Sequence, residues 1–310
     1  MLHGWIVLDK PVGLGSTTAV SAVKRILREA GEPKTKVGHG GTLDPLASGV
    51  LPIALGEATK LCGRMLDAVK GYDFTITFGE ETDTLDAEGQ VLSTSDVRPN
   101  REEIEAILPR FTGDIEQAPP AYSALKIDGK AAYARARAGE RVEMKSRMTT
   151  IHSLSVRHPR ESGDPAEKQL GSRFRGNDEL TLSCTVSKGT YIRSLARDIA
   201  HALNTVGHVT MLRRTRAGPF SLESAISLDF LEEAAKARRL TETVLPLTAA
   251  LDDIPALPVT PDQAQLLRHG QRLAGFPAKP GLQLAIEGST PVALVEAAAD
   301  GLRVVRGFNL

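Results

Sequence analysis

The stretch GHGGTLDPLASG, residues 38–49, decides how this chain is interpreted. It holds one carboxylate, Asp44, behind three glycines and directly before Pro45, a pattern that neither a regular helix nor a central strand accommodates. Glycine permits positive φ angles and a close approach of the backbone to a ligand. Two interpretations therefore fit these residues. Asp44 either bonds only nearby backbone amides in a turn, or it presents one ionised oxygen to a substrate.

The composition indicates a globular protein with one large and one small domain. The chain has 310 residues, of which 41% are hydrophobic, and no run of eighteen apolar residues that would span a membrane. Residues 1–10 predict a strand and no signal peptide. Cys62 and Cys184 match neither a metal site nor a disulfide framework, so we expect a cytoplasmic protein.

Charge is balanced in total but uneven along the chain. Lys plus Arg equals Asp plus Glu at 38 each. Residues 80–116 contain eleven acidic and three basic residues, and residues 124–147 contain seven basic and three acidic ones. Residues 207–221 hold three arginines and no acid. This asymmetry permits a basic face on a neutral protein, although charge alone equally fits ordinary solvated surfaces.

Hydrophobic periodicity predicts strands and helices that alternate without a strict βαβ order. No Walker or dinucleotide-binding pattern is present, which argues against a nucleotide cofactor. We therefore expect an α+β fold with a mixed, mainly antiparallel sheet and flanking helices. The expected strands are 5–9, 50–55, 72–78, 151–156 and 179–186, and the expected helices are 16–30, 57–69, 101–111 and 190–203.

The last part of the chain predicts a separate unit. Residues 244–261 are rich in Pro, Leu and Asp, as expected of a linker. Three short strands are expected beyond it, at 282–286, 291–296 and 302–306. The sequence thus predicts a catalytic domain over 1–247 and a small β-rich appendage over 248–310.

Residues 157–178 (RHPRESGDPAEKQLGSRFRGND) do not fit the pattern around them. They are polar, lack a period and separate two strands that we expect to pair as a hairpin. The segment resembles the translated palindromic repeat elements found inside many bacterial genes. We interpret it as a tolerated, mobile surface insertion, the alternative being an additional basic RNA-binding loop.

Four further patches accompany the Asp44 stretch: LDKPVG (residues 8–13), Tyr72 in its strand, SKGTYIRSL (187–195) and LRRTRAGPF (212–220). Taken in order with residues 38–49, they resemble the bacterial TruB-type tRNA pseudouridine-55 synthases of the pseudouridine synthase superfamily. The resemblance covers residues 4–247 apart from the insertion. The tail more weakly resembles the PUA-like appendage of that family, which would grip tRNA through basic and backbone contacts.

The resemblance implies an isomerase that acts on one uridine, at position 55 in the T-loop of tRNA. The glycosidic bond breaks, the uracil rotates, and C5 bonds to C1′, without a cofactor or a metal. Because the base leaves and returns, one carboxylate suffices where many glycosidases need two. The family's aspartate corresponds to Asp44, as nucleophile or electrostatic partner. Whether it attacks the ribose or the base stays open.

The family also assigns roles to two residues around Asp44. Arg193 corresponds to the arginine that pairs with the aspartate and keeps it ionised and oriented. Tyr72 corresponds to a catalytic tyrosine that stacks on the target base. Without the resemblance, however, the register of Tyr72 with Phe74 and Ile76 favours a plain core aromatic.

The remaining candidates would bind the substrate. Tyr191 and Leu212 correspond to residues that line the base pocket, and His39 to a histidine that fills the stack where the flipped nucleotide has left. Lys10 and Lys188 are candidates for phosphate contacts or for anchoring loops, and the sequence does not separate these roles.

Two other functions compete with this one. A non-catalytic tRNA-binding or tRNA-folding protein of the same fold would not need Asp44, Tyr72 and Arg193 together. A carboxylate-based glycan hydrolase would need a second carboxylate in a comparable constrained motif, and the sequence shows none. We expect a monomer.

Overall fold

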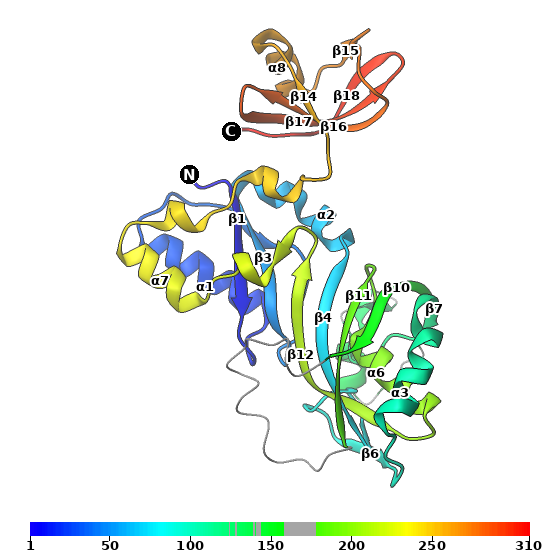
Figure 1. Cartoon of the computed structure of the whole chain (residues 1–310). Helices are drawn as coiled ribbons and strands as arrows, with labels where there is room; N and C mark the ends of the chain where they lie inside the picture. Colours follow the sequence, from blue (N-terminus) through cyan, green and yellow to red (C-terminus); the bar gives the residue numbers. More distant parts are fainter. Residues whose placement is uncertain (124, 128, 139, 141–143, 158–177) are drawn as a thin grey trace.

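The computed structural model, which describes residues 1–123, 125–127, 129–138, 140, 144–157 and 178–310, contains one nine-stranded sheet (Figure 1). Seven of its strands follow in the spatial order β1 (Gly4–Lys10), β3 (Ser48–Leu55), β12 (Gly207–Ala217), β4 (Lys70–Phe78), β11 (Glu179–Val186), β10 (Arg147–Val156) and β7 (Gly113–Gln117). The short β2 (Val37–His39) pairs with β3, and β13 (Phe220–Ser221) with β12. Among the strands described for this sheet, only β12 and β3 pair in parallel, so the expected mixed, mainly antiparallel α+β fold is confirmed.

The strand β12 joins the two halves of this sheet. It pairs antiparallel with β4 along most of its length, from Gly207 opposite Phe78 to Ala217 opposite Lys70. On its other edge, Arg213 and Arg214 alone pair with the start of β3. Strands from the N-terminal part of the chain therefore reach the rest of the sheet through a strand that comes late in the sequence.

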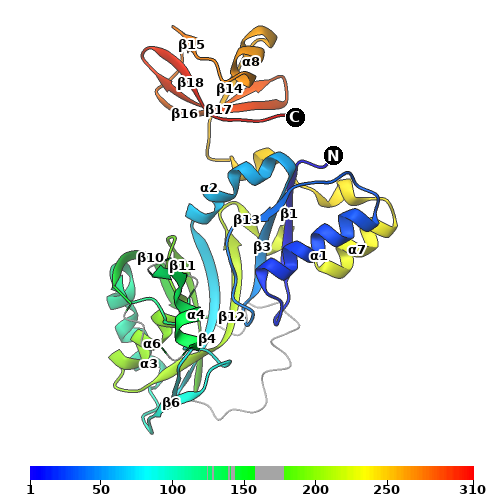
Figure 2. The ribbon, with the colours of Figure 1, turned by 180° about the vertical axis from the view of Figure 1, so that it is seen from behind.

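Helices cover the two halves separately. α1 (Ser16–Glu29) and α7 (Leu228–Lys236) lie side by side next to β1 and β2, whereas α6 (Ile192–Ala202) packs on β12 and β4 (Figures 1 and 2). One apolar stripe of α1 is buried: Ala19, Val20, Val23, Ile26 and Leu27. None of the helices in the described part of the chain is both long and apolar enough to cross a membrane.

Several element boundaries differ from the sequence-based expectation. Residues 56–67 form a 3₁₀ helix, η1 (Gly56–Leu61), followed by the short α2 (Cys62–Asp67). The Thr59 hydroxyl donates to the Gly56 carbonyl at 2.7 Å, which competes with regular helix bonding. Likewise α3 (Arg101–Ile107) ends before Pro109, which has no amide hydrogen, and continues as η2 (Leu108–Phe111).

Ser16 does not cap α1, although serine is a common capping residue. The N-cap residue is Gly15, which has no side chain to cap the helix. The Ser16 hydroxyl instead donates to the carbonyl of Leu43 at 2.9 Å and accepts from the Leu43 amide at 2.8 Å. Ser16 therefore contacts the Asp44 loop instead of capping its own helix.

The C-terminal residues form their own five-stranded sheet with α8 (Pro261–Arg268), drawn in orange and red in Figure 1. In spatial order its strands are β14 (Ala256–Pro258), β16 (Gly281–Glu287), β17 (Thr290–Ala298), β18 (Gly301–Gly307) and β15 (Leu273–Ala274). Each of the three expected tail strands is present and slightly longer than predicted.

The two sheets are connected by a small apolar cluster. Leu247 and Leu251 of the expected linker are buried beside Trp5, and Phe308 from the end of the chain joins the same cluster. Polar contacts reinforce it, since the Glu57 carboxylate accepts the Asn309 amide at 2.8 Å. The division of the chain at residue 247 and the PUA-like nature of the appendage stay predictions.

Most of the proposed insertion lies outside the described residues, but both of its ends are held on the sheet. β10 and β11 pair as the expected hairpin up to Val156 opposite Leu182. Arg157 forms an ion pair with Asp73 at 2.9 Å, and Asp178 with Arg98 at 2.8 Å. The hairpin is therefore closed by contacts of its own strands and of these two end residues.

Replacing residues 158–177 with a four-residue Gly/Ser linker should leave the melting temperature within about 3 °C, because loop-closure entropy changes by only about 1 kcal/mol. Thermal unfolding followed by circular dichroism measures this. The matched variant Arg157→Ala, which leaves the Asp73 carboxylate buried without its cation, should lower the melting temperature more. A drop of about 10 °C on deletion would contradict the interpretation as an insertion.

Candidate active site

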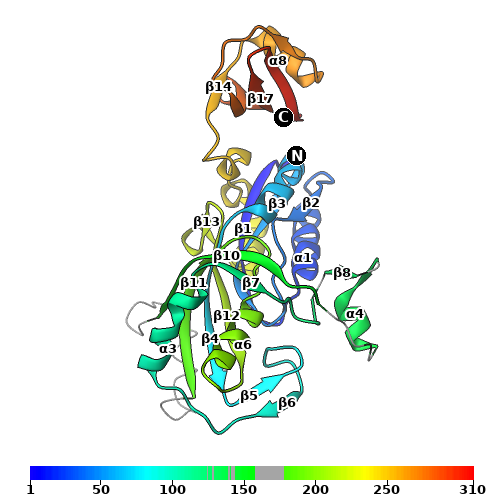
Figure 3. The ribbon, with the colours of Figure 1, turned by 90° about the vertical axis from the view of Figure 1, so that its right-hand side faces the viewer.

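A cleft of about 870 Å³ opens between the Asp44 loop, the start of β4 and the N-terminus of α6. The chain contains four tyrosines, and all of them line this cleft: Tyr72, Tyr122, Tyr133 and Tyr191. Tyr133 belongs to α4 (Ala132–Arg137), which stands off the body of the protein with β8 (Lys126–Ile127) and β9 (Lys130–Ala131) (Figure 3). Aromatic rings gathered in one cleft are typical of a surface on which nucleic-acid bases stack.

Five of the eight residues singled out in the sequence line this cleft: Asp44, Tyr72, Tyr191, Arg193 and Leu212. They come from four segments of the chain, up to 168 positions apart between Asp44 and Leu212 (212 − 44). The other three, Lys10, His39 and Lys188, lie close by but do not line it.

Arg193 is the centre of the site's polar network. Its Nη2 lies 2.9 Å from Oδ2 of Asp44 and donates to the Tyr122 carbonyl at 3.1 Å. Its Nη1 lies 3.1 Å from Oδ2 of Asp86 and donates to the Thr84 carbonyl at 2.8 Å. The Arg193 side chain is 7% exposed, whereas that of Asp44 is 39% exposed. The arginine is thus a buried support, and the Asp44 carboxylate opens to the cleft.

Asp86 was missed by the sequence reasoning. Its side chain is 4% exposed, and its Oδ1 accepts from the Thr84 hydroxyl at 2.6 Å and from the Glu88 amide at 3.1 Å. It follows Leu85, a non-glycine residue with a φ of 62°, which is strained backbone. The segment docks where β12 bulges, with Val209 bonded to Leu85 on one side and to Ala87 on the other.

Asp86 is a second carboxylate close to Asp44 in the fold, although the sequence shows no second carboxylate in a comparable constrained motif. Asp86 and Asp44 contact the same guanidinium. Asp86 is buried and already accepts bonds from Arg193, Thr84 and the Glu88 amide, so it lacks the access that a glycosidase acid needs. The glycan hydrolase interpretation therefore gains no support from this second carboxylate.

The backbone on both sides of Asp44 is immobilised by other segments. Ser16 holds Leu43 through two hydrogen bonds. The Pro45 carbonyl accepts the Gly13 amide at 2.8 Å and the Lys10 ammonium at 3.3 Å. Pro45 is thus bonded to the LDKPVG patch, which explains why the two motifs occur together.

Lys10 anchors loops and does not face a phosphate. The residue is fully buried, and its ammonium also donates to the carbonyls of Pro11 and Leu14 at 2.8 and 2.7 Å. Burial lowers the pKa of Lys10 to about 8, against the opposing effect of the nearby Asp44 carboxylate. Between the two roles that the sequence left open, the geometry favours anchoring.

The arginine-rich segment 207–221 does not form the basic face that its charge permits. Arg214 is buried and donates to the carbonyls of Val50, Thr42 and Gly41 at 2.7, 3.2 and 3.1 Å. It therefore holds the Asp44 loop from the side of β12. Arg213 pairs with Asp9 at 2.9 Å.

Gly49 is needed because the chain passes directly over Arg214. Its φ is 98°, and a Cβ atom would lie 2.2 Å from the carbonyl oxygen of Arg214. Glycine is needed here because two backbone segments approach each other closely. The sequence had suggested that a ligand approaches the backbone instead.

His39 lies at the end of β2, with its Nδ1 accepting the Gly41 amide at 3.4 Å. Burial, and secondarily the positive charge of Arg214, lower the pKa of His39, so the ring is neutral at pH 7. A neutral ring is compatible with packing against bases and offers no proton at neutral pH.

Tyr191 is positioned from two sides. The buried Gln117 side chain accepts the Tyr191 amide at 2.8 Å and donates to its carbonyl at 3.2 Å. The Arg147 guanidinium lies 5.2 Å from the centre of the Tyr191 ring, a cation–π contact. The sequence indicated neither supporting residue.

Two further lysines near the cleft, Lys188 and Lys70, differ in exposure and in their contacts. Lys188 is exposed and pairs with the exposed Asp67 at 2.9 Å on the rim, where such pairs contribute little stability. Lys70, which the sequence reasoning missed, lines the cleft while being only 7% exposed, and it donates to the carbonyls of Leu66 and Ala68. Burial, and next the charge of Arg214, lower the pKa of Lys70 to about 8.

Comparison with known proteins agrees with this geometry. A protein-family model described as TruB family pseudouridylate synthase (N terminal domain) matches residues 24–192. A second family model, described as tRNA pseudouridylate synthase B C-terminal domain, matches residues 193–252. The chain belongs to the TruB pseudouridylate synthase family. It is therefore an enzyme of that class, as the sequence motifs predicted.

Curated relatives of this TruB-family chain match over its full length. It is 58% identical to tRNA pseudouridine synthase B of Zymomonas mobilis, over 99% of this chain and 96% of that protein. It is 57% identical to that of Novosphingobium aromaticivorans, over 100% and 98% respectively. A solved H/ACA RNP bound to a substrate RNA containing 2′-deoxyuridine has a TM-score of 0.72 over 99% of this chain and 86% of that one, at 24% identity, which shows a shared fold.

Among the described residues, no group of three His, Cys, Asp or Glu side chains is placed to hold a metal ion. The cleft instead concentrates tyrosines, the carboxylates of Asp44, Asp86 and Glu88, and buried cations. This set is suited to holding a base and to stabilising charge.

Asp86→Asn should lower kcat for pseudouridine formation by about 100-fold with little change in KM, because it loosens the guanidinium that orients Asp44. Single-turnover assays on an unmodified tRNA transcript measure this. The matched variant Asp73→Asn removes another buried, arginine-paired carboxylate outside the cleft. It should reduce stability and leave kcat unchanged. Equal losses of kcat in both variants would contradict the positioning role.

Lys70 predicts a dependence of stability on alkaline pH. With a pKa of about 8 in the folded protein against 10.5 as the ordinary value, the unfolded chain binds more protons between these two pH values. The free energy of unfolding of the wild type should therefore rise relative to Lys70→Met from pH 8 towards 10.5, and stay parallel below pH 8. Urea unfolding at pH 7 and 9.5 measures this, with Lys236→Met as an exposed control. A relative loss at pH 9.5 would show that the folded protein favours the ammonium.

Proposed function

We propose that this protein converts one uridine of tRNA, at position 55 in the T-loop, into pseudouridine, and that Asp44 is the nucleophile. The observation that carries the proposal is the half-exposed Asp44 carboxylate held by buried Arg193 in a cleft lined by every tyrosine of the chain. Family membership supports the reaction class, and the relatives' names support tRNA as the substrate.

The reaction is an exchange of bonds within one nucleotide. The bond between N1 and C1′ breaks and a bond between C5 and C1′ forms, while the proton on C5 is lost and N1 gains one. The product has the same formula as the substrate, so no oxidant, reductant or energy source enters the balance. The protein has to accept the departing base, allow it to rotate and stabilise the charge that develops.

Asp44 has a free oxygen for this reaction. Arg193 contacts Oδ2, and no hydrogen bond to Oδ1 is formed by any residue in the described ranges. Oδ1 can therefore attack the ribose or the base while the guanidinium holds the other oxygen. Because three neighbouring segments fix the loop, the carboxylate is oriented before substrate binds.

The side chains around Asp44 suit a uracil that has left its stack. Tyr72 and Tyr191 line the same cleft, and Leu212 contributes an apolar surface from β12. Tyr72 would stack on the base and help to move the C5 proton. His39 would fill the vacated place in the loop, for which its neutral ring is suited.

Asp44→Asn should abolish pseudouridine formation while the Kd for tRNA stays within a few fold, because the amide keeps the shape and loses the nucleophile. The protein is incubated with an unmodified tRNA transcript, pseudouridine is mapped at nucleotide resolution, and a transcript with cytidine at position 55 serves as the control substrate. The matched variant Asp67→Asn on the rim should retain activity.

Product in the Asp44→Asn variant would overturn the role of Asp44. Absence of product with the wild type, despite tight tRNA binding, would favour the non-catalytic tRNA-binding protein. Product at another nucleotide would retain the chemistry and exclude the proposed position.

A further inference from the structure

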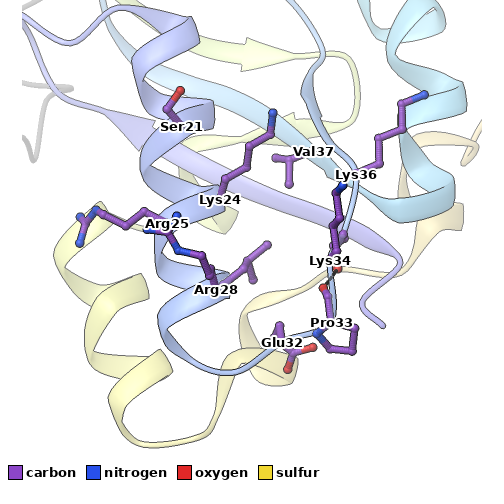
Figure 4. Close-up of a pocket in the computed structure, with 11 residues that line it drawn as sticks. Ser21, Lys24, Arg25, Arg28, Glu32, Pro33, Lys34, Lys36 and Val37 are labelled. Carbon is purple, nitrogen blue, oxygen red and sulfur yellow. Dashed lines mark hydrogen bonds between the residues drawn. The ribbon is translucent and has the colours of Figure 1, made fainter.

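A second cavity, of about 1110 Å³, lies between the C-terminal half of α1 and the extended residues 32–37 that lead into β2 (Figure 4). We call it the α1 cavity. Figure 4 shows that basic side chains approach it from both walls. Its lining residues are Ser21, Lys24, Arg25, Leu27, Arg28, Glu32, Pro33, Lys34, Thr35, Lys36 and Val37.

The charge of the α1 cavity is strongly one-sided. Five of its lining residues are cationic and only Glu32 is acidic, on a chain whose total charge is zero. Arg25 is already engaged, with Glu29 at 3.2 Å and Glu232 at 2.6 Å. In the part of the chain that the structure describes, the remaining four cations form no ion pair: Lys24, Arg28, Lys34 and Lys36.

These four charges contribute nothing evident to the fold. Lys24 and Arg28 are separated by one helical turn on α1, where two like charges repel each other. Both side chains are exposed, as are Lys34 and Lys36 on the facing wall. Like charges collected without a counter-ion are relieved by an anionic ligand. The arrangement therefore points to a function in binding.

The α1 cavity and the cleft differ in the part of a nucleic acid that they suit. The cleft holds all four tyrosines, whereas none of the residues that line the α1 cavity is aromatic. Without aromatic rings the cavity offers no platform for bases. Long cationic side chains around an open hollow are suited to phosphate groups.

The α1 cavity leads directly to the reaction centre along the chain. Lys36 precedes β2, which ends at His39, and the Asp44 loop follows. Lys36 is five positions before Gly41, which lines the cleft, and five residues of extended chain span at most about 17 Å. α1 lies on the same face of the sheet as α4, which borders the cleft (Figures 2 and 3).

We propose that the α1 cavity binds backbone phosphates of the double-helical RNA arm whose loop places its uridine at Asp44. This inference rests on the proposed function. The arm would run from the cleft over β2, with Lys34 and Lys36 on one side and Lys24 and Arg28 on the other. These cations carry no sequence information, and they fix the register of the arm relative to Asp44.

The test compares two double variants that lose the same charge. Lys34→Gln/Lys36→Gln removes two cations from the α1 cavity, and Arg110→Gln/Lys236→Gln removes two exposed cations elsewhere. The Kd for an unmodified tRNA transcript is measured from 50 to 300 mM KCl. The cavity variant should bind more weakly, and the slope of log Kd against log salt should fall by about two, one for each lost phosphate contact. The control should keep the wild-type slope.

Two further readouts keep the outcomes distinct. The KM for tRNA of the cavity variant should rise above that of the wild type and of the control variant, because the two lost lysines are the ones proposed to contact the arm. An unchanged slope, or an equal fall in the control, overturns the proposal even if pseudouridine forms normally. If the slope falls as expected but the wild type makes no pseudouridine, the α1 cavity stands as an RNA-binding site and the proposed function fails.

Discussion

One buried guanidinium holds the candidate active site together. Arg193 on α6 bonds to Asp44, to Asp86 and to two backbone carbonyls, and so ties three segments that are far apart in sequence. A buried cation is tolerated only when its partners are all in place, and removing one partner of such a pair costs about 3–5 kcal/mol. The same contacts that satisfy Arg193 therefore orient the Asp44 carboxylate, which is open to the cleft.

Local sequence patterns predicted most of the helices and strands of the fold and about half of the residues that surround Asp44. The α1 stripe, the main strands and the tail strands follow from periodicity within a few residues. No such pattern marks Asp86, because it lies in an acidic stretch that resembles a solvated surface. Its structural role follows only from its contact with Arg193. No local pattern predicts the contacts of Arg214 and Ser16 either. Their types suggest RNA contact and helix capping, whereas tertiary contacts with the Asp44 loop use them instead.

The neutral net charge of the chain conceals two surfaces with opposite chemistry. Aromatic side chains and three carboxylates line the cleft, whereas the α1 cavity collects cations, four of which form no ion pair within the described part of the chain. The most conspicuous cluster of arginines, at residues 213–216, is largely turned inward to hold backbone. Composition averages over these differences, and the role of each cation depends on whether a carbonyl, a carboxylate or only solvent faces it.

The position of β12 in the sheet has a consequence for how the protein folds. The strands before residue 79 include both β3 and β4, yet these are joined only when β12, at residues 207–217, enters between them. Asp44 belongs to one side of that gap, and Tyr72 to the other. During synthesis, about 130 residues must follow β4 before β12 can pair with both β3 and β4. Contacts between residues so far apart in sequence form late and slow folding. Assembly of the cleft is thus coupled to the insertion of the central strand, and a chain stopped before β12 contains Asp44 and Tyr72 without the strand that joins their two sides of the sheet.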